Sequence, residues 1–289
     1  MADADGRSTR IRLRRSWQAG RVQARQSAGQ PRVLPDALII GTQRGGTTSL
    51  YEYLSQHPDV VPPLGKELQY FSTEYERGDR WYRAHFPTER AVARRKAGGR
   101  GCVVFEASPY YLFHPHAAAR AAATVPAAKL IALLRDPVER AYSHYEHMRQ
   151  RGLEPLAFED AVAAEPERLA GEVERMQADP RYQSRAHRIW SYVSRGRYAP
   201  QLSTWLAHFP REQLLVLRSE DLFADPAAAL RRVHDFVGVE PVALPDYPAY
   251  TRRRPGPPLR DDTRDALRAE FRASNDELRQ LLGQDVGWA

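Results

Sequence analysis

The sequence predicts a single α/β domain with a central parallel sheet flanked by helices. A chain of 289 residues that is 42% hydrophobic can bury one substantial core, and one domain of roughly 250 residues suits it better than two small ones. Short apolar runs bounded by turn or charge signals indicate buried strands, and the helical patterns between them indicate parallel pairing through crossover connections. The predicted strands are Ala37–Ile40, Cys102–Phe105, Leu130–Leu134 and Leu214–Leu217.

Helices are expected after or between these strands, and several of them open with a proline or with a capping Ser, Thr or Asp. Parallel sheets of this kind bind ligands at the carboxyl ends of their strands. One segment, Pro241–Pro258, is rich in proline and arginine, and we expect it to be a long functional loop. The predicted helices are Thr47–Gln56, Pro137–Arg149, Ala157–Ala164, Pro200–His208, Pro226–Val237 and Thr263–Leu282.

The formal net charge of +7 has its excess mainly in the first 32 residues and in Arg252–Arg254. Such a charge suits nucleic acid, a membrane surface or a phosphorylated small molecule, and charge alone does not choose among them. Residues 1–32 are arginine-rich with few bulky apolar side chains, so we expect a basic flexible arm there, with a short frayed helix as the alternative, and the folded domain over residues 33–289.

A single cysteine, Cys102, excludes an intrachain disulfide framework and a cysteine-rich metal site. We see no compact His, Asp or Glu cluster with metal-ligand spacing, and we expect no metal. No apolar run approaches the ~18 residues of a membrane span, and the N-terminal arginines lack the apolar stretch of a secretory signal. We therefore expect a cytoplasmic protein without an integral membrane segment.

A glycine-rich turn, Gly41–Ser49, follows the first predicted strand and leads into a helix headed by three hydroxyl residues. Backbone amides and a helix N-terminus in this arrangement form an anion site. Four residues separate Gly41 from Gly46, as in a Walker A loop, but Thr47 stands where that loop has its lysine. Arg44 supplies a positive charge from inside the loop, which suits a phosphate that is the leaving group.

A second strand-to-helix turn, within Lys129–Tyr145, carries another set of anion ligands. Arg135 ends the strand and Ser143 lies eight residues later on the incoming helix, so that both side chains can converge on one phosphate. A buried pair between Arg135 and Asp136 is the alternative, and it leaves Ser143 without a role.

These two motifs, about ninety residues apart, resemble those of sulfotransferases that use 3′-phosphoadenosine-5′-phosphosulfate, in particular the carbohydrate branch that includes heparan sulfate sulfotransferases. The resemblance extends over nearly the whole chain from residue 35 and implies a P-loop NTPase-like sulfotransferase fold. Arg44 stands where that branch commonly has lysine. The resemblance implies donor contacts from Arg44, Gly45, Gly46, Thr47, Thr48, Ser49, Arg135, Ser143, Tyr198, Arg253 and Arg254.

The segment Lys66–Phe71 resembles the family segment whose glutamate deprotonates the acceptor hydroxyl, and Glu67 occupies that place. Pairing with Lys66 on an exposed surface is its alternative role. Gln69 stands where heparan sulfate enzymes often have histidine, and Glu106–Tyr111 resembles a segment of theirs with Ala107 in place of lysine. Both differences fall on the acceptor side, for which Glu106, Tyr110 and Gln69 are the candidate residues. Glu106 is either the second candidate for the base or a group that orients other residues at the floor of the cleft.

The function expected from these residues is transfer of a sulfuryl group to the hydroxyl of a sugar, glycolipid or natural product, with Arg44 and Glu67 catalytic and a small-molecule or glycan acceptor. The alternative is a P-loop kinase or another nucleotide-dependent phosphotransferase, for which the Walker lysine is missing. A nucleic-acid-binding module is the third reading, and it lacks a recognisable motif. The oligomeric state is left open.

Overall fold

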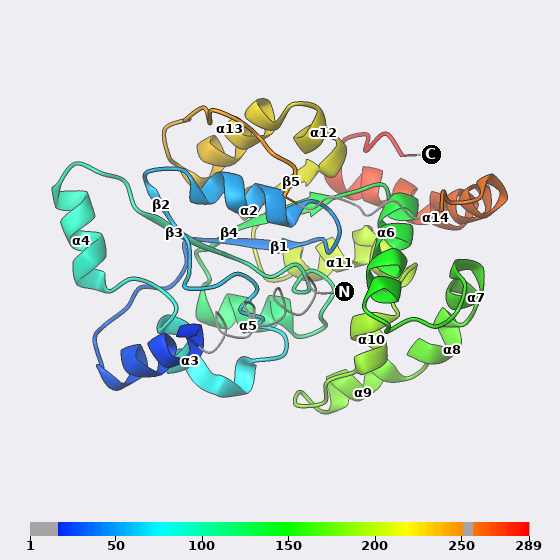
Figure 1. The fold of residues 1–289 in the computed structure, drawn as a ribbon, viewed down its shortest axis with the longest axis horizontal. Coiled ribbons are helices and arrows are strands. Elements are labelled where there is room, and N and C mark those ends of the chain that lie inside the picture. Colours follow the sequence, from blue (N-terminus) through cyan, green and yellow to red (C-terminus); the bar gives the residue numbers. More distant parts are fainter. Residues whose placement is uncertain (1–16, 251–256, 289) are drawn as a thin grey trace, which may run out of the picture.

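The computed structural model describes residues 17–250 and 257–288. Its centre is a five-stranded parallel sheet in the order β2-β3-β1-β4-β5 (Figure 1). Strand β1 lies in the middle, where Leu38 pairs with Glu106 on one side and with Leu130 on the other. The strands are β1 (Ala37–Gly41), β2 (Val60–Val61), β3 (Val103–Ala107), β4 (Lys129–Leu134) and β5 (Leu214–Arg218).

Helices cover both faces of the sheet, which explains why its strands are continuous apolar runs. Helices α2 and α13 pack on one face, and α5 and α11 pack on the other (Figure 1). The helices are α2 (Thr47–Ser55), α3 (Gly78–Arg83), α4 (Glu89–Ala97), α5 (Ala117–Thr124), α6 (Pro137–Gln150), α7 (Phe158–Ala163), α8 (Glu165–Leu169), α9 (Glu172–Ala178), α10 (Arg185–Ile189), α11 (Tyr198–Leu206), α12 (Ser219–Ala224), α13 (Pro226–Val237) and α14 (Asp261–Leu282).

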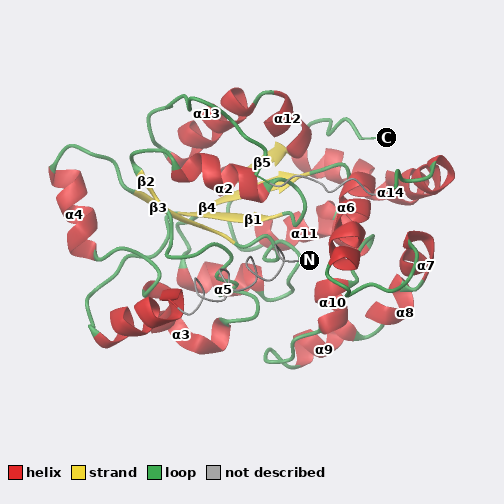
Figure 2. Ribbon diagram, viewed as in Figure 1, coloured by secondary structure: helices red, strands yellow, loops and turns green. Residues whose placement is uncertain are grey.

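A separate hydrophobic cluster joins α6 to α7 and α14, beside the carboxyl ends of the central strands (Figure 2). Tyr145 of α6 packs against Phe158 with ring centroids 5.1 Å apart, and Phe271 of α14 is fully buried in the same cluster. This packing holds α6 across the end of the sheet.

The prediction of one α/β domain with a central parallel sheet is confirmed. The four predicted strands are present to within two residues at each end, and the six predicted helices are present with similar boundaries. Strand β2 was not anticipated because two residues carry no periodic signal. The described parts of Pro241–Pro258, residues 241–250 and 257–258, have no helix or strand.

Over its described part, the N-terminal segment follows the helical alternative and packs on the domain. Residues 17–27 are helical and Val22 is buried. Arg25 donates from Nη1 to the carbonyl oxygen of Ala84 at 3.2 Å, and the buried Arg32 donates to that of Phe86 at 2.6 Å. The arginines that suggested a solvated arm therefore cap backbone carbonyls of the domain over residues 17–32.

Candidate active site

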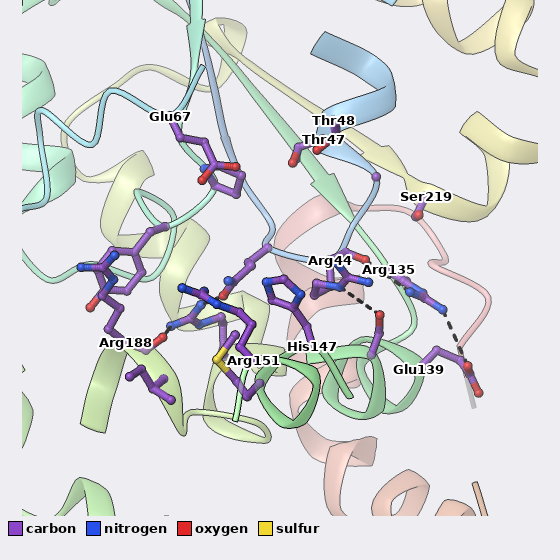
Figure 3. A pocket seen from close by; sticks show the side chains of 18 of the residues that line it. Arg44, Thr47, Thr48, Glu67, Arg135, Glu139, His147, Arg151, Arg188 and Ser219 are labelled. Carbon is purple, nitrogen blue, oxygen red and sulfur yellow. Dashed lines mark hydrogen bonds and ion pairs between the residues drawn. The ribbon is translucent and has the colours of Figure 1, made fainter. Parts of the chain in front are cut away.

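A cavity of about 680 Å³ opens at the carboxyl ends of the strands. Its lining comes from the segments that follow β1, β2, β3, β4 and β5 and from helices α6 and α10. Arg135 and Ser219 lie at one end and Arg188 at the other, with Arg44 and Glu67 between them (Figure 3). This is the edge at which parallel sheets of α/β proteins bind their ligands.

The loop after β1 is shaped by close backbone approach. A Cβ on Gly45 would lie 2.5 Å from the carbonyl oxygen of Leu133, which only glycine avoids. Gly46 caps the N-terminus of α2 with a φ of 91° in the left-handed region, which glycine adopts without strain. The side chains of Thr47 and Thr48 line the cavity, whereas Ser49 is fully buried and does not. The N-terminus of α2 therefore faces the cavity with its unpaired amides.

The two predicted anion motifs meet in this cavity. Arg44 Nε donates to Ser143 Oγ at 3.0 Å, and Arg135 Nη1 donates to the carbonyl oxygen of Arg44 at 3.3 Å (Figure 3). Arg135 also lies 3.7 Å from Glu139 on the first turn of α6. The alternative, an Arg135 pair with Asp136, is not found, because Asp136 Oδ1 instead accepts from the amides at the start of α6.

One of the implied donor residues, Tyr198, lies outside the cavity lining. Tyr198 is buried, does not line the cavity, and donates its hydroxyl to the carbonyl oxygen of Arg135 at 2.8 Å. Tyr198 therefore holds the backbone of Arg135, a cavity residue, without lining the cavity itself. Arg253 and Arg254 lie outside the described residues.

Glu67 lies on the opposite side of the cavity from α6. Its side chain is 49% exposed, and Lys66 Nζ is 3.3 Å from its Oε1. The same ammonium group donates to Thr48 Oγ1 at 2.7 Å. The pairing with Lys66 is thus present, and it links Glu67 to the glycine-rich phosphate loop, Gly41–Ser49.

Glu106 does not reach the cavity, contrary to its assignment on the acceptor side. Its carboxyl group is fully buried, and its Oε1 accepts from the hydroxyls of Tyr82 and Tyr111, each at 2.9 Å. Burial raises the pKa of Glu106 to about 7. Tyr110 and Gln69 do line the cavity, and the Tyr110 hydroxyl is 2.8 Å from His187 Nδ1.

Among the histidines and arginines that line the cavity, four were not singled out from the sequence: His147, Arg151, Arg188 and Arg195. Ser143, His147 and Arg151 are spaced by four residues, so they share one face of α6 and its C-terminal continuation, and this spacing was the available signal. Burial, and then the charges of Arg44 and Arg151, lower the pKa of His147 to about 4. His147 is therefore a neutral imidazole at pH 7.

Cations outnumber anions around the cavity. Five arginines line it against three glutamates, Glu67, Glu139 and Glu220. Burial lowers the pKa of Arg195 to about 9, and this guanidinium donates to Gln43 Oε1 in the phosphate loop. The surplus of positive charge favours an anionic ligand.

Within residues 17–250 and 257–288, no group of three or more His, Cys, Asp or Glu side chains is arranged to bind a metal ion. In the same part of the chain, none of the helices has both the length and the apolar character needed to cross a lipid bilayer.

Residues 34–246 match the family model of the sulfotransferase domain. The chain belongs to the sulfotransferase family. The resemblance inferred from the two anion motifs is thereby confirmed. A sulfotransferase from Alicyclobacillus acidocaldarius has a similar structure, with a TM-score of 0.65, 32% sequence identity, and coverage of 88% of this chain and 98% of that one.

The names of two curated relatives of this sulfotransferase family member state a glycan, heparan sulfate, as their substrate. Heparan sulfate glucosamine 3-O-sulfotransferase 3B1 of Mus musculus is 32% identical over 278 residues, which cover 88% of this chain and 65% of that protein. The human bifunctional heparan sulfate N-deacetylase/N-sulfotransferase 3 is 32% identical over 281 residues, with 86% of this chain and 30% of that protein covered. The chain spans less than two thirds of the length of these relatives.

Proposed function

We propose that this sulfotransferase family member transfers the sulfuryl group of 3′-phosphoadenosine-5′-phosphosulfate to an acceptor hydroxyl. The observation that carries the proposal is the direct contact between the two anion motifs, Arg44 Nε to Ser143 Oγ at 3.0 Å, in one cationic cavity. A donor with phosphate groups at both the 3′ and the 5′ position of its ribose matches two adjacent anion sites.

The 5′ end of the donor would be held by the loop before α2. The amides at the N-terminus of α2 and the hydroxyls of Thr47 and Thr48 suit the phosphosulfate group. Arg135 and Ser143 would bind the 3′-phosphate, since a guanidinium and a hydroxyl are suitable donors to phosphate oxygens. Gly45 and Ser49 act through the shape of the loop.

The chemical step is an in-line displacement at sulfur. The acceptor oxygen forms a bond to sulfur while the bond from sulfur to the 5′-phosphate oxygen breaks, and that oxygen keeps the electron pair. Glu67 takes the acceptor proton. Arg44 neutralises the charge that develops on the departing phosphate, which is where electrostatic stabilisation lowers the barrier most. Lys66, in contact with both Thr48 and Glu67, adds positive charge between the two sides.

The acceptor would enter on the side of Glu67, Gln69 and Tyr110. We assign the acceptor to the class of small molecules or glycans with a free hydroxyl. The aromatic ring of Tyr110 suits the apolar face of a sugar or a natural product. The amide of Gln69 and the carboxylate of Glu67 suit its hydroxyl groups. The names of the curated relatives support a glycan without fixing which one.

Isothermal titration calorimetry tests the donor assignment. We expect 3′-phosphoadenosine 5′-phosphate to bind equally well with and without magnesium, and more tightly than ATP, because the cavity offers a separate site for the 3′-phosphate. Magnesium-dependent binding of ATP with no binding of the bisphosphate would instead indicate a phosphotransferase and refute the proposal.

A further inference from the structure

The backbone that carries Glu67 has an unusual conformation. Glu67 and Gln69 have φ values of 60° and 56°, in the left-handed region that residues other than glycine rarely adopt. A pair of such residues persists only where the surrounding structure holds it. The Glu67 side chain itself is half exposed, and its carboxylate contacts the neighbouring Lys66. Its position in the cavity is therefore set by its backbone.

Two hydrogen bonds to the end of β3 hold this backbone. The amide of Glu67 donates to the carbonyl oxygen of Ala107 at 3.0 Å. The amide of Gln69 donates to the side chain of Ser108, with 3.0 Å between N and Oγ. Ser108 is fully buried, so water does not replace its hydroxyl. The second bond is the one that depends on a side chain.

Tyr70, which follows Gln69 in the chain, is connected to the end of β3 through Tyr82 and Glu106. The ring of Tyr70 stacks on that of Tyr82 with centroids 4.2 Å apart and an angle of 8° between planes. The hydroxyl of Tyr82 donates to Glu106 Oε1 at 2.9 Å, and Tyr111 donates to the same oxygen at 2.9 Å. Glu106 and Ser108 are two residues apart at the end of β3. Ser108 binds the amide of Gln69 directly, and Glu106 binds Tyr82, on which Tyr70 stacks.

We propose that Ser108 is a positioning residue for Glu67, and that the buried Glu106 with Tyr82 secures the same segment at Tyr70. The inference rests on the proposed role of Glu67 as the base. Proton removal requires the carboxylate within hydrogen-bond reach of the acceptor hydroxyl, and small displacements of a catalytic group cost rate. Loss of the Ser108 hydroxyl would leave a buried amide unpaired and release the left-handed turn.

The test compares Ser108→Ala with Ser108→Thr, which keeps the hydroxyl. Thr88→Ala is the matched control, since Thr88 Oγ1 also accepts a backbone amide, that of Ala91 at 3.2 Å, in α4 away from the cavity. Three quantities are measured. They are the amide hydrogen exchange of the peptide covering residues 67–70, the Kd of 3′-phosphoadenosine 5′-phosphate, and the kcat for consumption of labelled phosphosulfate donor. The acceptor in the kcat assay is drawn from a panel of sugars and phenols, or is water.

We expect Ser108→Ala to raise amide exchange in residues 67–70 and to lower kcat about tenfold or more, with the Kd of the bisphosphate within about twofold of the parent. Ser108→Thr should restore both exchange and kcat, and Thr88→Ala should change neither. An unchanged kcat in Ser108→Ala, or a loss of bisphosphate binding that parallels the loss of kcat, would overturn the inference.

A second variant covers the case in which Ser108→Ala does not fold. Tyr82→Phe keeps the ring that stacks on Tyr70 and removes only the hydroxyl bond to Glu106. Raised exchange in residues 67–70 with lowered kcat supports the inference, and parental values of both refute it. Failure of the proposed function gives a different result, because the parent protein would then neither bind the bisphosphate nor consume the donor.

Discussion

Arg44 is the residue at which the two halves of the proposed donor site meet. Its φ of 72° turns it out of the loop after β1, and its Nε donates to Ser143 on α6. The sequence predicted both residues as anion ligands, although they are 99 positions apart in the chain. It did not predict their mutual contact, since that depends on α6 lying across the end of β1.

Arg44→Ala should lower sulfuryl transfer by about 10²-fold, because the charge on the leaving phosphate loses the arginine of the phosphate loop. Arg44→Lys should recover part of the rate, since a point charge replaces the planar fork. Initial rates with labelled donor measure both. Arg94→Ala, an exposed residue of α4, serves as the control, and an Arg44→Ala enzyme as fast as that control would contradict the assignment.

Glu67→Gln should keep the affinity for 3′-phosphoadenosine 5′-phosphate and lose rate by about 10²-fold or more, because the amide does not accept the acceptor proton. Calorimetry and donor turnover together provide the measurement. Parental turnover in this variant would exclude Glu67 as the base.

Helix α6 is the element that organises one side of the cavity. Asp136 caps its N-terminus, where Oδ1 accepts from the amides of Val138 and Glu139 at 2.9 and 3.0 Å. Ser143 and His147 follow on the cavity side of the same helix. The capping residue and Pro137 made the start of this helix predictable from sequence. Which of its side chains face the cavity depends on its packing against α7 and α14.

Asp136→Ala should lower the free energy of unfolding by about 1 kcal/mol, because α6 loses its N-terminal cap. It should also weaken binding of the bisphosphate, because the first turn of α6 no longer holds Glu139 beside Arg135. Thr88→Ala removes the cap of α4, with a comparable loss of stability. Urea denaturation and calorimetry compare the pair. Equal bisphosphate affinity in the two variants would show that the start of α6 does not shape the donor site.

At the scale of the whole molecule, several histidines are buried in neutral form. Burial, followed by the charge of Arg120, lowers the pKa of His114 to about 3, and burial with the charge of Arg195 does the same for His187. Their unfolded pKa is about 6.5. Between pH 6.5 and about 3, these two histidines are therefore protonated in the unfolded chain and neutral in the folded protein.

Stability that is present above pH 6.5 should accordingly be lost as the pH falls through this window, by about 1.4 kcal/mol per pH unit for each such histidine. The buried Glu106 has the opposite sign, since its folded pKa of about 7 costs stability as the pH rises from about 4.5 to 7. Histidines outnumber it, so urea midpoints measured between pH 7 and 4.5 should fall with acidification. A midpoint that stays level over this range would contradict the neutral state of His114 and His187.

The sequence by itself determined four of the five strands, the phosphate loop, the start of α6 and the family, because these depend on local patterns: short apolar runs, glycine spacing, caps and motif order. Tertiary structure decided which carboxylate reaches the cavity. Glu67 and Glu106 both follow or end strands, and only the packing of Tyr82 and Tyr111 around Glu106 removes it from the cavity. It also decided that residues 17–32 pack on the domain, since Arg25 and Arg32 bind carbonyl groups more than fifty residues away in the chain. Long-range contacts of this kind leave no periodic trace in the sequence.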